Sequence, residues 1–127
     1  MIAFNHVSNV LGAINPVSEI VAIAQRVDAL TVCDGAQGAP HMPVRFDALG
    51  VDFYAASAHK MLGPMGTGVL IGRREILYAM PPYQTGGDMI HLVGDEHTTW
   101  NVLPHRLEAG TPNVAGAVGL AAACDYL

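Results

Sequence analysis

Two residues that often take part in catalysis, Asp34 and Lys60, stand at the ends of apolar segments in the 127-residue sequence. Asp34 follows the β-prone run 30–33, and Lys60 ends the segment 57–60, which follows the run 51–56. An amine beside apolar side chains loses its proton readily and then forms a Schiff base, and a carboxylate keeps a heterocyclic nitrogen protonated. On the pair alone the simpler interpretation is favoured, in which Asp34 caps a turn and Lys60 is merely exposed.

The segments around these residues predict an α/β domain with a mostly parallel sheet. Apolar runs predict strands over 2–7, 30–33, 51–56 and 68–72. Polar groups at the carboxyl ends of strands in such sheets usually face a ligand crevice.

Helices are predicted between and after these strands. Asn15 and Pro16 form a helix-start signal, with Asn as the cap and Pro at the first helical position. The apolar residues that follow at helical spacing are Val17, Ile20, Val21, Ala24 and Val27. Further helices are predicted over 73–79 and 114–127.

The segment 80–112 differs from the rest of the chain. It contains paired prolines at 81–82, paired glycines at 86–87 and few periodic signals, so we expect a long functional or interfacial loop. The chain begins on a predicted strand and ends within a predicted helix, and just over half of its residues are apolar. These features favour a chain that lacks a partner, either a second subunit or the rest of a longer protein.

Composition argues against several classes of function. The net charge is −5 with no basic cluster, which argues against nucleic acid or an anionic membrane as the partner. No apolar run reaches the length of a transmembrane helix. The histidines 41, 91, 97 and 105 lack the spacing of a metal site, and two distant cysteines make no disulfide framework. The expected location is the cytoplasm.

Several motifs resemble those of one enzyme family. The stretches DGAQ at 34–37 and SAHKMLGP at 57–64 are similar to the cofactor motifs of class V aminotransferase-fold enzymes, which use pyridoxal 5'-phosphate (PLP). Four further motifs resemble the cysteine desulfurase and selenocysteine lyase branch of this family: HVSNVLG at 6–12, MPPY at 80–83, GGDMI at 86–90 and EAGTPN at 108–113. The resemblance runs in order across essentially the whole chain.

This resemblance implies a role for each candidate residue. Lys60 would hold PLP as a Schiff base and later move a proton at the substrate α-carbon. Asp34 would pair with the pyridine nitrogen, Gln37 would donate to the ring oxygen, and Asn9 would touch cofactor or substrate. The phosphate would be bound by Ser57, His59 and, from the neighbouring subunit of a homodimer, Thr111. Each residue taken singly is better explained as a turn, surface or structural residue, but the shared register makes all of those explanations improbable together.

The cysteines do not match the sulfur-accepting residue of the family. Cys33 lies on a predicted buried strand and points away from the face that Asp34 uses, and buried cysteines are usually inert. Cys124 is expected to pack on the last helix, and Arg106 to form an ion pair in preference to binding a substrate carboxylate. By resemblance, the catalytic cysteine and the substrate-binding arginine come later in the chain than residue 127.

The sequence therefore predicts part of the large domain of the PLP-dependent transferase fold, similar to aspartate aminotransferase. Residues 1–127 would be this partial domain, without its N-terminal part and without the C-terminal small domain. The implied function is a cysteine desulfurase that converts L-cysteine to L-alanine and an enzyme-bound persulfide for iron–sulfur cluster assembly, with a sulfur-acceptor protein as a further partner. The alternatives are another class V lyase, such as selenocysteine lyase, or an inactive truncated binding or dimerisation module.

Overall fold

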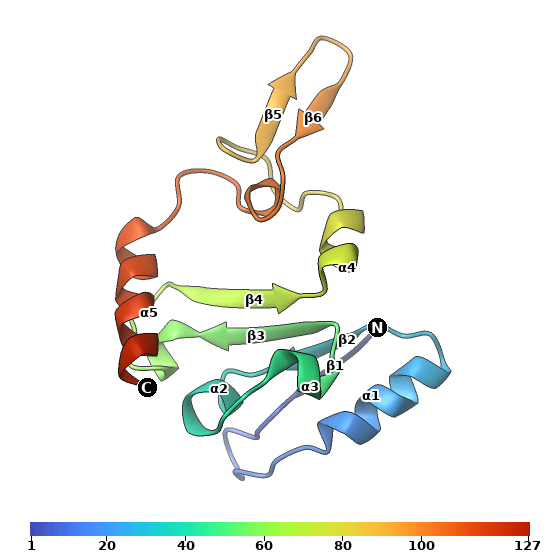
Figure 1. Ribbon diagram of the computed structural model, residues 1–127, viewed down its shortest axis with the longest axis vertical. Coiled ribbons are helices and arrows are strands. Elements are labelled where there is room, and N and C mark those ends of the chain that lie inside the picture. Colours follow the sequence, from blue (N-terminus) through green and yellow to red (C-terminus); the bar gives the residue numbers. More distant parts are fainter. The chain divides into compact units, whose positions relative to one another are not determined.

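A four-stranded sheet organises the first part of the chain in the computed structural model, which describes residues 1–127. The strands are β1 (Ile2–Asn5), β2 (Thr31–Asp34), β3 (Phe53–Ser57) and β4 (Gly68–Gly72), and they lie in that order (Figure 1). The first three are parallel and β4 is antiparallel to β3. The prediction of a mostly parallel α/β sheet is therefore confirmed.

The chain divides into two compact units, which are described separately. The first comprises Met1–Arg73 and Ala115–Leu127 and contains this sheet, and the second is Arg74–Val114. The helices of the first unit are α1 (Val17–Arg26), α2 (Gly38–His41), α3 (Phe46–Leu49) and all but the first residue of α5 (Val114–Tyr126), with a short 3-10 turn, η1 (Ala58–Lys60). The two four-residue helices were not predicted, because one turn is too short to give a periodic signal.

Helix α1 buries the predicted apolar stripe at Val17, Val21 and Ala24. Its expected cap is wrong: the Asn15 side chain donates to the backbone oxygen of Asn5 at 2.6 Å and to its side-chain oxygen at 2.8 Å. Asn15 thus ties the start of the helix to the end of β1 instead of capping the helix. The stripe also ends earlier than predicted, because the helix stops at Arg26 and Val27 is 66% exposed.

The core lies on one face of the sheet. Phe4, Cys33 and Tyr54 are neighbours in the strand register, so their side chains share that face. Val17 and Val21 of α1 pack against them, together with Val51 and partly buried residues: Ala39, Val44, Phe46 and Leu49. Successive side chains alternate between faces, so the residue after Cys33, Asp34, points to the other face and is exposed.

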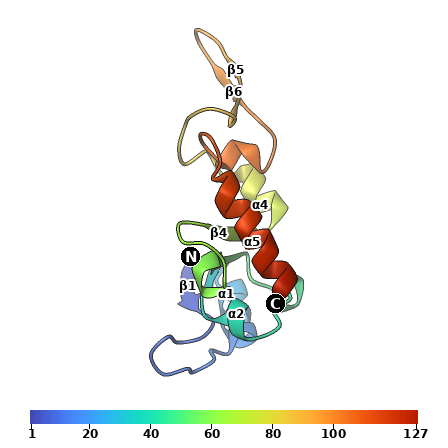
Figure 2. The same ribbon diagram turned by 90° about the vertical axis from the view of Figure 1, so that its left-hand side faces the viewer.

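The last helix, α5, lies beside β4, as the second view shows (Figure 2). An apolar groove of about 310 Å³ is lined by Ala56 of β3, Val69 of β4 and Leu120 of α5, among others. Val118 and Tyr126 of the same helix are exposed. The predicted helix over 114–127 is confirmed, but only Gly116 and Ala123 of it are buried.

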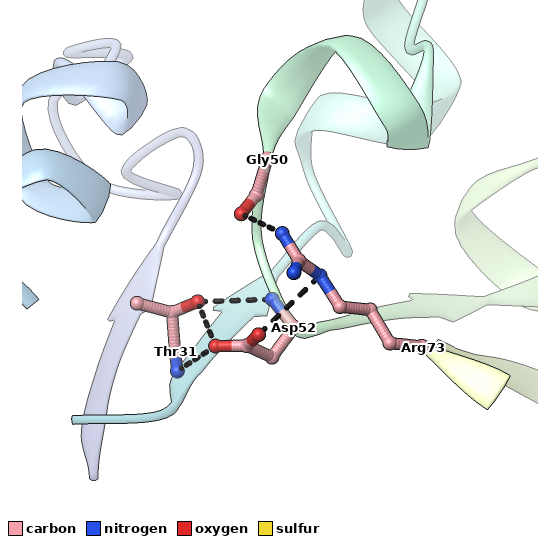
Figure 3. Close-up of polar contacts among 4 residues, drawn as sticks. All are labelled: Thr31, Gly50, Asp52 and Arg73. Carbon is pink, nitrogen blue, oxygen red and sulfur yellow. Dashed lines mark hydrogen bonds and ion pairs between the residues drawn. The ribbon is translucent and has the colours of Figure 1, made fainter. Parts of the chain in front are cut away.

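A polar network joins three strands at the edge where β2 and β3 begin and β4 ends (Figure 3). The Asp52 Oδ2 atom accepts hydrogen bonds from the Thr31 amide at 2.7 Å and the Thr31 hydroxyl at 2.8 Å. The Asp52 amide donates to the same hydroxyl at 2.9 Å. The other oxygen, Oδ1, lies 3.4 Å from Arg73 Nε, and Arg73 also donates to the Gly50 carbonyl at 3.0 Å.

The second unit contains α4 (Arg74–Ala79), the antiparallel hairpin of β5 (Ile90–Val93) and β6 (Thr98–Trp100), and a 3-10 turn, η2 (His105–Leu107). The hairpin corrects the prediction of an irregular loop over 80–112. Its strands are three and four residues long with a register shift after Ile90, which hides the period-2 pattern that predicts strands.

Arg106 also differs from its prediction, because it neither forms an ion pair nor faces a carboxylate. Its guanidinium donates to the carbonyls of Tyr78 at 3.2 Å and Met80 at 3.0 Å. These carbonyls lie at and just beyond the end of α4, where the last turn leaves acceptors without helical partners. Arg106 therefore holds the C-terminal end of that helix.

We predict that Asp52→Ala lowers the free energy of unfolding by about 2–4 kcal/mol, because it leaves the buried Thr31 hydroxyl and amide without their acceptor. Urea unfolding followed by circular dichroism measures the change. Asp47→Ala is the matched control, since Asp47 is exposed and has no polar partner in the chain, and it should stay within about 0.5 kcal/mol. Equal losses in the two variants would contradict the structural role assigned to Asp52.

Candidate active site

The carboxyl ends of β1, β2 and β3 meet at one edge of the sheet because these strands are parallel. Asn5, Asp34 and Ala55 are neighbours in the strand register at this edge. The last residues of these strands and the segments that follow them carry six of the seven predicted site residues: Asn9, Asp34, Gln37, Ser57, His59 and Lys60. The fold therefore brings these six to one edge of the sheet.

Backbone hydrogen bonds fix the position of Asp34, and its carboxylate is partly unpaired. Its carbonyl accepts from the His6 amide at 2.8 Å, and the amide of the next residue, Gly35, donates to Ala55 at 2.8 Å. One carboxylate oxygen, Oδ1, accepts from the Ala36 amide at 2.9 Å. The other oxygen has no partner within the chain, so it is free to accept from a bound molecule.

Lys60 ends the 3-10 turn η1 directly after β3, and its side chain is half-buried. The turn is tightly closed: the carbonyl of Ala58 accepts from the amides of Met61 at 2.8 Å and Gly63 at 2.9 Å. The Ala58 amide donates to Thr67 at 3.0 Å, which ties the turn to the segment entering β4. The amine itself makes no ion pair in the chain. The Lys60 amine is therefore unpaired, on a backbone turn that hydrogen bonds hold in place.

Ser57 and His59 flank Lys60 along the chain. Ser57 is the last residue of β3 and is half-buried, whereas His59 is exposed. Neither side chain makes a hydrogen bond within the chain, so a hydroxyl and an imidazole are available beside the lysine.

Asn9 and Gln37 lie on the two loops next to these residues. Asn9 is exposed at the tip of the loop 7–14, whose Ser8 hydroxyl accepts backbone amides at 3.2 and 3.3 Å. Gln37 is half-buried just before α2, and its carbonyl accepts from His41 Nδ1 at 2.7 Å. The Gln37 amide group has no partner in the chain.

Thr111 belongs to the second unit, where it is exposed and directly precedes Pro112. Its expected role at the site of a neighbouring subunit stays a prediction.

A buried pair beneath the edge was not predicted as functional. His6 and Tyr54 are 6% and 2% exposed, and His6 Nδ1 lies 3.0 Å from the Tyr54 hydroxyl. Their rings meet edge to face with centroids 5.8 Å apart. In the sequence, each of these residues is only a polar residue within or beside an apolar run. Such residues are too common to identify a pair so far apart in sequence.

The structure confirms that Cys33 is a buried residue of the core. It is 0% exposed, and burial raises the pKa of its thiol to about 11, with the Asp34 charge adding to the effect. A thiol is nucleophilic only as the thiolate, so Cys33 is unreactive near neutral pH. Cys124 is exposed on α5, and both cysteines are free. Cys124 was expected to pack, and its exposure corrects that expectation.

The donor set at this edge fits PLP. The cofactor needs an amine for its aldehyde, a carboxylate for its ring nitrogen and donors for its oxygen and phosphate. Lys60 supplies the amine, Asp34 has a free carboxylate oxygen, and the side chains of Gln37, Ser57 and His59 hold donors that no protein group uses. The structure contains no group of three or more residues able to hold a metal ion.

Comparison with known proteins identifies the family of the chain. The aminotransferase class-V family profile matches residues 1–127, so the chain belongs to this family. The chain is 58% identical to the probable cysteine desulfurase 2 of Mycobacterium leprae over 127 residues, which cover all of this chain and 30% of that protein. Among solved structures, it matches the cysteine desulfurase CsdA of Escherichia coli with a TM-score of 0.95 and 45% identity, covering 98% of this chain and 31% of that one.

A more distant structural relative has a different reaction. The cystine C-S lyase C-DES, solved with its reaction product cysteine persulfide, matches with a TM-score of 0.85 and 30% identity, over 98% of this chain and 34% of that one. The chain thus spans about a third of the length of these relatives. None of its helices has both the length and the apolar character needed to cross a membrane.

We predict that only Cys124 reacts quickly with a thiol reagent in the folded chain at pH 8. With a pKa of about 11, about one Cys33 thiol in a thousand is ionised at that pH, and burial hinders it further. The rate at Cys33 should rise as the pH approaches 11, and both thiols should react at once in denaturant. Cys124→Ser removes the fast phase and serves as the control. Equal fast rates for both thiols at pH 8 would contradict this assignment.

Proposed function

We propose that the edge formed by the carboxyl ends of β1, β2 and β3 holds PLP, and that the whole protein is a cysteine desulfurase. The observation that carries the proposal is the gathering of Lys60, Asp34 and the Ser57–His59 donors at this edge, in a chain of the aminotransferase class-V family. Lys60 is also the only lysine of the sequence. No other side chain in the chain offers a primary amine.

Each residue would act through its own chemistry. Bound PLP supplies an electron sink that stabilises negative charge at the α-carbon of an amino acid. The Lys60 amine takes the proton from that carbon and returns it, as a general base and then a general acid. The free Asp34 oxygen would accept a hydrogen bond from the ring nitrogen, which keeps the sink effective.

The remaining donors would orient the cofactor. Ser57 and His59 would donate to the phosphate, Gln37 would donate to the ring oxygen, and Asn9 would contact cofactor or substrate. Thr111 would reach the phosphate of the neighbouring subunit in a homodimer. Fixing the ring in this way sets which bond of the substrate is weakened.

The reaction would convert L-cysteine to L-alanine. The bond between Cβ and sulfur breaks, a new sulfur–sulfur bond forms on a cysteine thiolate of the enzyme, and Cβ gains a proton. Cys33 is unsuited to be this thiolate because it is buried, so the accepting cysteine would lie outside residues 1–127. The persulfide sulfur would pass to an acceptor protein for iron–sulfur cluster assembly, in the cytoplasm.

A second candidate function is supported by the likeness to the C-S lyase C-DES. In that case the same cofactor residues would serve an elimination that releases pyruvate. Cleavage of selenocysteine by another class V lyase is the alternative that the sequence motifs leave open. The residues that separate these reactions would lie outside the chain, so the reaction products decide between them.

We predict that a chimera, in which residues 1–127 replace the matching stretch of Escherichia coli CsdA, forms alanine from L-cysteine. Lys60→Arg should lower the rate at least about 100-fold, because a fixed positive charge cannot carry the proton. Asp34→Asn should lower it as well, whereas the control Asp47→Asn should leave it unchanged. Chromatography of alanine and pyruvate, with cysteine and selenocysteine as substrates, measures the outcome. A folded but inactive chimera, or full activity of Lys60→Arg, would contradict the proposal.

A further inference from the structure

The His6–Tyr54 pair lies directly under the turn that carries Asp34 and Gln37. A Cβ placed on Gly35 would lie 2.0 Å from the Tyr54 ring, and one placed on Gly38 would lie 2.6 Å from His6 Nδ1 and 2.8 Å from the Tyr54 hydroxyl. Real Cβ atoms do not approach so closely. The backbone of the turn therefore rests on the two rings, and both of its glycines are needed for that approach.

The same pair is tied to the strands on either side of the turn. His6 follows β1, and its amide donates to the Asp34 carbonyl at 2.8 Å, while Tyr54 lies on β3 beside Cys33 of β2. Within the turn, the amide of Ala39 donates to the Gly35 carbonyl at 2.8 Å. The hydrogen bond from Tyr54 of β3 to His6, which follows β1, thus lies beneath the turn that follows β2, the strand between them.

The surroundings keep both members of the pair uncharged. Burial lowers the pKa of His6, and burial together with the nearby Cys33 thiol and Asp34 carboxylate raises the pKa of Tyr54 to about 12. Neutral imidazole has one acceptor nitrogen, and the buried phenol has no other acceptor in the chain. The Tyr54 hydroxyl therefore donates to His6 Nδ1, which places the imidazole proton on Nε2.

We propose that this neutral His6–Tyr54 hydrogen bond is a positioning device, which holds the 34–38 turn so that Asp34 and Gln37 meet the cofactor ring together. The proposal rests on the proposed function, because it assigns the turn to PLP. Neither residue is a catalytic group in this account. Loss of the hydrogen bond should make the turn more mobile without changing the register of the strands. The affinity for PLP should then fall, because Asp34 and Gln37 are no longer held in position before the cofactor binds.

The test compares three variants with the unaltered chain. Tyr54→Phe removes the hydroxyl and keeps the ring under Gly35, and His6→Asn keeps an acceptor near the position of Nδ1. Tyr83→Phe removes a hydroxyl from a side chain that is 92% exposed, and so is the matched control. Hydrogen exchange of the turn amides without cofactor and the dissociation constant for PLP are measured for each.

We expect Tyr54→Phe to speed exchange at the Ala36 and Ala39 amides roughly tenfold, and to weaken PLP binding by a similar factor. Amides of the β1–β2 pairing should keep their rates, which separates a loosened turn from a general loss of stability. His6→Asn and Tyr83→Phe should stay within about threefold of the unaltered chain in both measurements. If the isolated chain shows no protected amides, the same variants are measured in the CsdA chimera.

Three outcomes are decisive. Unchanged exchange in the turn of Tyr54→Phe would overturn the proposal. Faster exchange with unchanged PLP affinity would also overturn it, because the pair would then be structural only. If the unaltered protein binds no PLP, the proposed function fails, and the exchange rates still decide whether the pair holds the turn.

Discussion

The carboxylate of Asp52 sets the alignment on which the candidate site depends. It binds the first residue of β2, stands directly before β3 and contacts Arg73 directly after β4, so one side chain joins three strands at the edge away from the site. A slip of one residue in strand pairing moves every side chain to the opposite face. With this alignment fixed, Asp34 lies beside Ala55 and Ser57 lies beside Gly68 at the other edge.

Strand alternation then separates the core from the site. Cys33 and Asp34 are adjacent in sequence, yet one is fully buried in the core and the other is exposed on the opposite face. The core face carries Tyr54, whose ring and hydroxyl support the turn after Asp34. The buried His6–Tyr54 pair therefore links the packing of the core to the position of the Asp34 carboxylate.

Much of this arrangement could be predicted from the sequence. The four strands and α1 gave clear apolar patterns, and several motifs in register predicted the residues that gather at the edge. The hairpin of β5 and β6 could not be predicted, because its strands are too short for a clear alternation. Asn15 and Arg106 were misassigned because Asn15 bonds to the backbone and side chain of Asn5, and Arg106 bonds to backbone carbonyls remote in sequence. The His6–Tyr54 contact spans 48 residues and became visible only when the sheet brought β1 and β3 to either side of β2.

Reductive trapping of the cofactor on the chain shows whether Lys60 binds PLP. The chain is mixed with PLP, reduced with borohydride, digested with trypsin and mapped by mass spectrometry. Because Lys60 is the only lysine, the label has just one competing primary amine, at Met1. We expect a visible absorption band and a label on the peptide between Arg45 and Arg73, both lost in Lys60→Ala. A label at Met1 alone, or a band that survives in Lys60→Ala, would contradict it.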